Sequence, residues 1–168
     1  MVVEGKKMKF YTDDEIKKLI ETPKRITVRP QKQMQLVYKH YRNNLKLEST
    51  NGQFNFSVFM RKNEDFHENF SIGLVYHPTD DPREIHLLRC NGPHGPHQLF
   101  SHHEKCHLHI ATEANIREGL KEDRDAFITG EYSTFEDALI FFLKKCNIIN
   151  AGDHFELDRF QFLAEGND

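Results

Sequence analysis

Histidines concentrated between residues 89 and 109 are the part of this sequence best equipped for chemistry. The chain has 11 histidines, and six of them lie in this stretch, namely His94, His97, His102, His103, His107 and His109. Imidazole is the side chain whose charge changes near neutral pH, so a group of them can supply both an acid and a base. The stretch therefore predicts a functional site.

Four of the six histidines are placed to converge. Residues two apart in a strand point to the same face, so His107 and His109 project together, opposite Leu108 and Ile110. His94 and His97 belong to a turn rich in glycine and proline that follows an expected strand over residues 84–90. If that strand pairs with residues 106–112, the loop between them folds back and brings its histidines close to His107 and His109. His102 and His103 are expected to be loop residues without a role.

One use of such a cluster is RNA cleavage without a metal. One histidine would take the proton of a ribose 2′-hydroxyl and another would protonate the leaving 5′-oxygen. Arg89, or Arg117 further along the chain, would stabilise the charge that develops on phosphorus. The candidate catalytic residues are His94, His97, His107, His109 and Arg89.

Two other uses stay open. Neutral imidazole binds zinc, and the ligands would then be His94, His97, His107 and His109, with Glu113 as a further candidate. Alternatively the histidines do no chemistry and are turn residues or the polar face of an amphipathic strand.

The charge of the chain is unevenly distributed. Residues 1–50 hold twelve basic and six acidic side chains, although the whole chain has a net charge of −3. A basic surface can follow a phosphate backbone, and the candidates for nucleic-acid binding are Lys24, Arg25, Arg29, Lys39 and Arg42. A solvated lysine-rich face is the alternative. An acidic protein partner would be expected to meet the same region.

Hydrophobic periodicity predicts the elements that position the histidines. Apolar residues alternate with polar ones through 54–60, 70–76, 84–90 and 106–112, and around 45–47, with a tight-turn pair at Asn51-Gly52. Whether 33–41 forms a strand or a helix is left open. Capping signals predict a short helix over 13–21 after Thr12, and a longer one after Thr134 whose apolar side packs on the sheet. The predicted fold class is α+β, an antiparallel meander of about five strands with a helix on one face and a short N-terminal helix.

The length and composition favour one domain over residues 1–168. Within it we expect a basic N-terminal region (1–50), a sheet-and-helix core (51–148) and an acidic tail (149–168). No apolar run is long enough to span a membrane, and no apolar segment follows the first lysines, so we expect a cytoplasmic protein without a membrane partner. Three cysteines without a Cys-x-x-Cys motif argue against a disulfide framework.

The histidine segment also carries a family resemblance. Leu87 to His94, followed by His107-Leu108-His109, resembles a group of small, mostly uncharacterised bacterial and phage proteins that close with a helix like residues 135–148 here. Cys90 stands where that group has an aromatic residue. More distantly, the Arg-x-Asn-x-Pro-His arrangement is similar to the TumE-type toxins of toxin–antitoxin pairs, which are regarded as ribonucleases. The second resemblance implies RNA as substrate, a neutralising antitoxin as partner, and roles for Arg89, His94, His97, His107 and His109.

Two functions follow as hypotheses. The first is a toxin-like ribonuclease that uses clustered histidines as general acid and base and needs no cofactor. The alternative is a non-enzymatic phage or plasmid binding protein, an inhibitor of a host defence complex, whose histidines support a loop or hold a structural zinc.

Overall fold

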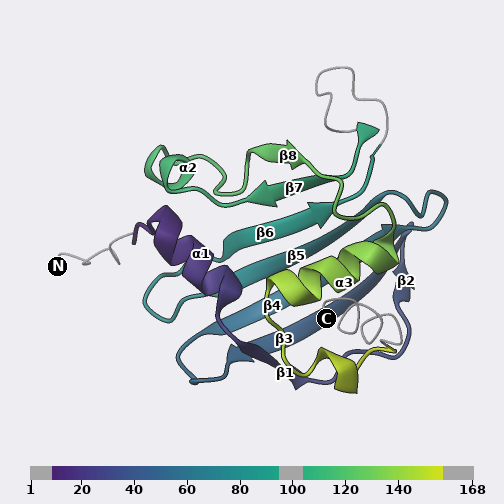
Figure 1. Ribbon diagram of the computed structural model, residues 1–168, viewed down its shortest axis with the longest axis horizontal. Coiled ribbons are helices and arrows are strands. Elements are labelled where there is room, and N and C mark those ends of the chain that lie inside the picture. Colours follow the sequence, from purple (N-terminus) through teal and green to yellow (C-terminus); the bar gives the residue numbers. More distant parts are fainter. Residues whose placement is uncertain (1–8, 95–103, 157–168) are drawn as a thin grey trace, which may run out of the picture.

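An antiparallel sheet forms the centre of the fold (Figure 1). The computed structural model describes residues 9–94 and 104–156. Its strands are β1 (Lys24–Val28), β2 (Gln35–Val37), β3 (His40–Ser49), β4 (Asn55–Asn63), β5 (Phe70–His77), β6 (Ile85–Asn91), β7 (His107–Ile110) and β8 (Ala126–Ile128). Their order in the sheet is β1-β3-β4-β5-β6-β7-β8, with β2 also paired to β3. The helices are α1 (Asp13–Glu21), α2 (Glu113–Arg117) and α3 (Phe135–Lys145), followed by a 3-10 turn at Ala151–Asp153.

The predicted α+β meander is confirmed, and the sheet is wider than expected. The five strands with clear alternation are β3 to β7, and three short strands, β1, β2 and β8, extend the two edges. Edge strands of three to five residues have too few positions to show a period of two. β2 settles the question of residues 33–41, because it forms a hairpin with β3 across a turn in which Tyr38 has φ 55°.

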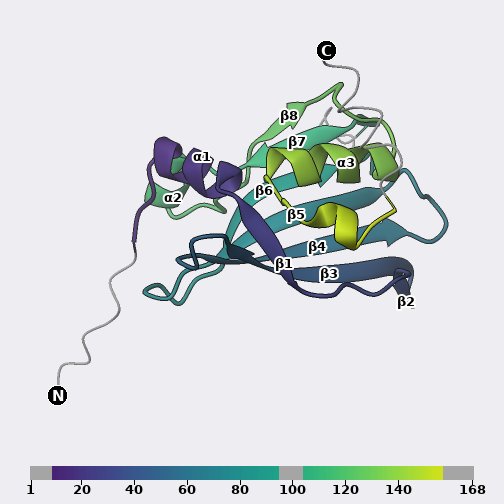
Figure 2. The same ribbon diagram turned by 60° about the horizontal axis from the view of Figure 1, so that its bottom comes forward.

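Both predicted helices begin where their caps place them. Thr12 and Glu15 form a reciprocal capping box at the start of α1, and the Thr134 hydroxyl accepts from the Asp137 N–H at the start of α3. Figures 1 and 2 show α1 and α3 on the same side of the sheet. We call the opposite side the open face. Neither α1 nor α3 covers it.

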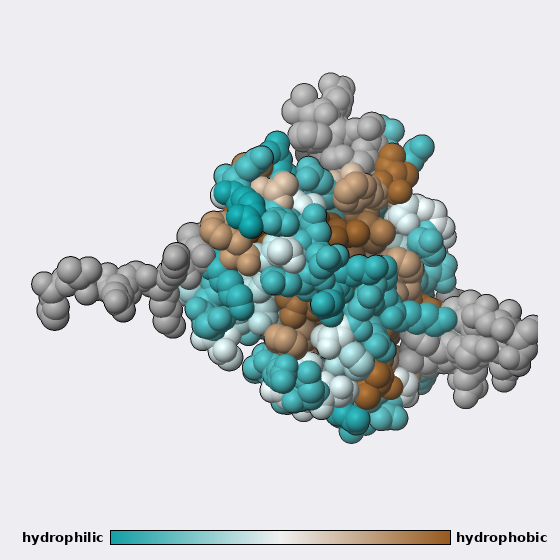
Figure 3. Space-filling view, turned by 60° about the vertical axis from the view of Figure 1, so that its left-hand side comes forward, coloured by the Kyte–Doolittle hydropathy of each residue, from teal (hydrophilic) through white to brown (hydrophobic). Residues whose placement is uncertain are grey.

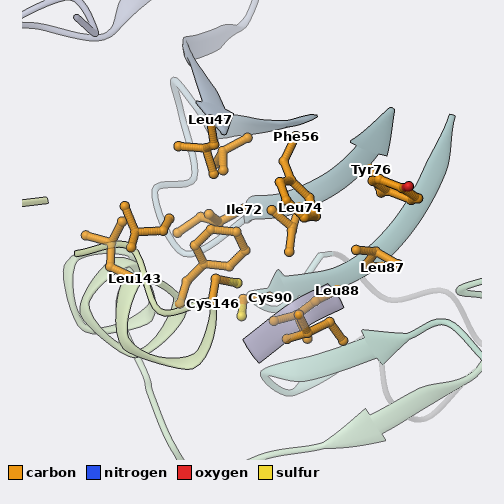
Figure 4. Packing of buried hydrophobic residues seen from close by; sticks show 14 of the residues in the cluster. Leu47, Phe56, Ile72, Leu74, Tyr76, Leu87, Leu88, Cys90, Leu143 and Cys146 are labelled. Atoms are coloured by element: carbon orange, nitrogen blue, oxygen red, sulfur yellow. The ribbon is translucent and has the colours of Figure 1, made fainter. Parts of the chain in front are cut away.

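The core fills the space between the helices and the sheet. Sheet residues such as Ile72, Leu74 and Cys90 are fully buried against α3, which contributes Phe142, with Cys146 at its end (Figure 4). These sheet residues share one face, because residues directly opposite each other in neighbouring strands point to the same side. The polar residues that alternate with them must therefore lie on the open face.

The outer surface is mainly polar. On the side shown in Figure 3, hydrophilic side chains predominate and hydrophobic ones form separate patches. Among the described helices, none is long and apolar enough to cross a membrane.

Candidate functional site

A row of polar side chains crosses the open face from β3 to β7. Strand register places Arg42 opposite Arg61, Arg61 opposite Ser71, Ser71 opposite Asn91, and Asn91 opposite His107. We call these five residues the polar row. It runs across the strands, so it joins residues that are up to 65 positions apart in the sequence.

Hydrogen bonds orient the β7 end of the polar row. The Ser71 hydroxyl donates to Asn91 Oδ1 at 2.7 Å, which turns the Asn91 amide nitrogen toward His107 Nε2, 3.4 Å away. His107 Nδ1 lies 2.7 Å from the Lys105 carbonyl, which can only accept, so Nδ1 carries a proton. In the neutral ring these two contacts place the proton on Nδ1 and leave Nε2 as an acceptor.

His94 meets His107 as the sequence predicts. The two Nε2 atoms are 3.2 Å apart, and the ring centroids 5.0 Å apart. Only one proton fits between two such nitrogens. With Nδ1 donating to Lys105, a neutral His107 can only accept at Nε2, and His94 would then supply the proton between the two rings.

The turn after β6 places His94 beside the sheet. Gly92 donates its N–H to the Phe70 carbonyl, and a Cβ added at Gly92 would come within 2.0 Å of the Glu68 carbonyl oxygen. The chain can thus pass close to β5 only with glycine at this position. From the helix side, the Tyr132 hydroxyl lies 3.0 Å and 2.8 Å from the Asn91 and His107 carbonyls as their shared donor, which ties the end of β6 to the start of β7.

Arg89 and His109 share a support in Asp123. The fully buried Asp123 carboxylate accepts from Arg89 Nε at 3.1 Å, and the Asp123 carbonyl accepts from His109 Nδ1 at 2.9 Å. His109 in turn packs its ring edge-on against His107, with centroids 5.2 Å apart. The segment between α2 and β8 therefore holds both side chains in place. The sequence patterns did not single out Asp123, which lies in a charged stretch without periodicity.

A pocket of about 440 Å³ opens beside this cluster on the open face. Its walls combine two guanidinium groups, two imidazoles, two amides, a hydroxyl and a phenyl ring. The lining residues are His40, Arg61, Asn69, Phe70, Ser71, Arg89, Asn91 and His94. Ser71 and Asn91 are 4% and 5% exposed, so the pocket reaches below the surface of the sheet. The arrangement is suited to an anion, because cationic and hydrogen-bond-donating groups surround one space.

His40 and Arg61 are pocket residues that the sequence analysis missed. Burial, followed by the charges of Arg61 and Arg42, lowers the pKa of His40 below its ordinary 6.5, so His40 is neutral at pH 7. Desolvation and the charges of Arg42 and Arg89 also lower the pKa of Arg61. Alternation with Leu45 and Met60 could have placed both side chains on the open face, but only the strand register brings them to His94.

The four candidate histidines divide into different positions. His94 lines the pocket, whereas His107 and His109 are buried behind it, with 0% and 8% exposure. His107 and His109 do share a face, as expected, and it is the face of Arg89 and Asn91. His97 lies outside the described residues. Arg117 is paired with Glu113 at 2.8 Å and does not line the pocket.

The five candidate nucleic-acid residues do not form one surface. Lys24 is fully buried, and its ammonium donates to the carbonyls of Ile20, Thr22 and Cys146 within 2.9 Å, so its place on a binding surface is corrected. A lysine is expected at the surface from its residue type alone. The burial of Lys24 comes from packing between the ends of α1 and α3. The others are exposed: Arg25 and Arg42 belong to β1 and β3, Lys39 to the β2–β3 turn, and Arg29 lines a pocket beside α3.

The side chains that could bind a metal ion were compared within the described residues. Across residues 9–94 and 104–156, no group of three or more His, Cys, Asp or Glu side chains is arranged to hold a metal ion. The zinc alternative includes His97, which this part of the chain does not contain.

Comparison with known proteins adds no relative. No family model, curated protein or solved structure matches the chain.

Proposed function

We propose that this protein is a toxin-like ribonuclease that cleaves RNA at the open-face pocket by metal-independent acid–base chemistry. The observation that carries the proposal is the pocket wall itself, where His40 and His94 face one space together with Arg61 and Arg89. Cleavage of a phosphodiester by a 2′-hydroxyl needs a base, an acid and a cation for the charge on phosphorus, and this wall supplies all three.

The two pocket histidines take different roles in the proposal. His40 is neutral at pH 7, because burial and the neighbouring Arg61 and Arg42 lower its pKa, so it acts as the base that accepts the 2′-hydroxyl proton. His94 acts as the acid. Neutral His107 accepts a hydrogen bond from His94 Nε2 and so stabilises the positive charge of a protonated His94. His94 would then deliver the proton to the 5′-oxygen through Nδ1.

The arginines hold the phosphate between the two imidazoles. Arg89 is oriented by Asp123 through its Nε, and Arg61 lies on the neighbouring side of the pocket. His107 and His109 are buried and are therefore positioning residues in this proposal, not groups that touch RNA. A cytoplasmic location and an acidic antitoxin as partner belong to the same proposal.

The test is degradation of RNA by the purified full chain in the presence of EDTA. We expect His40→Ala and His94→Ala each to reduce the rate about 10²-fold or more, the usual effect of losing a general acid or base. His67→Ala is the matched control, because His67 is exposed and does not line the pocket. The 2′-O-methyl form of the RNA should be resistant.

Three outcomes would contradict the proposal. Cleavage that both pocket variants retain at the wild-type rate would remove the acid–base assignment. RNA binding without any cleavage would favour the non-enzymatic binding protein, and stoichiometric zinc whose chelation unfolds the chain would favour the structural-metal alternative.

A further inference from the structure

Uncompensated positive charge extends from the pocket along the polar row. Arg42 and Arg61 face each other across β3 and β4, where like charges destabilise a sheet. In the part of the chain that the structure describes, neither has a carboxylate within ion-pair distance. By contrast, Arg83 and Arg89 are each bound to a buried aspartate. An arginine pair that is present although it destabilises the sheet indicates a surface that binds an anion.

The positive charge covers more than one phosphate group. Arg42, Arg61 and Arg89 belong to β3, β4 and β6, so they spread over three strand spacings, about 14 Å. Arg61 and Arg89 line the pocket, whereas Arg42 lies outside it on the neighbouring strand. A single phosphate can occupy the pocket, but only a chain of phosphates can also engage Arg42.

The pocket reaches below the surface of the sheet. Its lining includes the buried Ser71 and Asn91, and its volume of about 440 Å³ falls in the range of sites for small ligands. A nucleotide in a duplex reaches such a site only after it unpairs and leaves the base stack, and this step costs free energy. A nucleotide in a single strand is already unpaired, so its cost is lower.

From these observations we infer that the open face binds single-stranded RNA in preference to duplex RNA, with one unpaired nucleotide in the pocket and an adjoining phosphate at Arg42. The inference rests on the proposed function for its site and adds the substrate class. It assigns to Arg42 a contact with the RNA strand outside the pocket.

Binding is measured by fluorescence anisotropy with a short labelled 2′-O-methyl RNA, which cannot be cleaved through its 2′-oxygen. The same strand is tested alone and annealed to its complement. We expect the single strand to bind about tenfold tighter or more, since the duplex must first release a nucleotide. Arg42→Gln should lower the slope of log affinity against log salt by about 0.7, the value for one phosphate contact on a single strand.

Lys17→Gln is the control, because Lys17 is an exposed cation of α1 on the other side of the sheet. Its salt slope should equal that of the wild type. Equal affinity for single strand and duplex, or an unchanged slope in Arg42→Gln, would overturn the inference even if the protein cleaves RNA. Failure of cleavage with the strand preference intact would overturn the proposed function alone.

Discussion

His40 shows how neighbouring groups set the protonation state of a side chain. Nothing near it in the sequence marks it as a base, and it lies far from the histidine-rich stretch. Burial, together with the positive charges of Arg61 and Arg42, disfavours its protonated form and keeps it neutral at pH 7. The same arginines that would attract a phosphate thus prepare His40 to accept a proton.

Replacement of Arg61 by glutamine should therefore raise the pKa of His40. A base works only when neutral, so its activity falls as the pH drops through its pKa, and the acidic limb of the pH–rate profile should move to higher pH. NMR titration of the His40 ring measures the same shift independently of activity. Arg29→Gln should leave it unchanged. A His40 titration that does not move in Arg61→Gln would show that Arg61 does not act on His40.

At the scale of elements, Lys24 joins two helices through one ammonium group. Its Nζ donates to the Ile20 and Thr22 carbonyls at the end of α1 and to the Cys146 carbonyl at the end of α3, and lies 4.7 Å from the centre of the Phe56 ring. A positive charge at this place also interacts favourably with the negative ends of both helix dipoles. Burial lowers the pKa of Lys24 to about 8, so it is still mainly charged at neutral pH.

We predict that Lys24→Met destabilises the protein strongly although methionine is apolar and of similar length. Three carbonyl groups would lose their donor inside the protein, and a cost of roughly 3 kcal/mol or more follows from unsatisfied buried groups. Urea denaturation measures the change in the free energy of unfolding. Lys17→Met, at an exposed position of α1, should change it by less than about 0.5 kcal/mol. Similar values for the two variants would refute the capping role.

For the whole molecule, the sheet and the C-terminal helix meet at two buried thiols. Cys90 of β6 and Cys146 at the end of α3 are both 0% exposed and lie within the same core cluster (Figure 4). Burial raises the pKa of both thiols, that of Cys146 to about 12. They are thus protected from alkylation for as long as helix and sheet stay packed.

If the chain unfolds as one unit, Cys90 and Cys146 should become reactive together. Alkylation at increasing urea, followed by mass spectrometry, should give the same midpoint for both cysteines and for the loss of circular dichroism. Cys106 is only partly buried and serves as the internal comparison, with reaction beginning in the folded state. Exposure of one of the buried thiols at distinctly lower urea would show that helix and sheet separate before the sheet unfolds.

The extent to which the sequence predicts this protein follows the range of the interactions involved. Alternation through β3 to β7 and the caps at Thr12 and Thr134 depend on residues a few positions apart, so they could be predicted directly. The common face of His107 and His109 is likewise a consequence of the period of a strand. The meeting of His94 with His107 was predictable because one loop connects their strands.

The rest depends on register between distant strands and on packing across the sheet. Only register sets Arg42, Arg61, Ser71, Asn91 and His107 in one row, and a shift by one residue in any pairing would send those side chains to the other face. Only the approach of α3 to α1 turns Lys24 from a surface cation into a buried cap. The sequence by itself thus determined the longer strands, the two capped helices and the histidine pair. The tertiary structure decided which cations surround the pair, because charge acts through space and not along the chain.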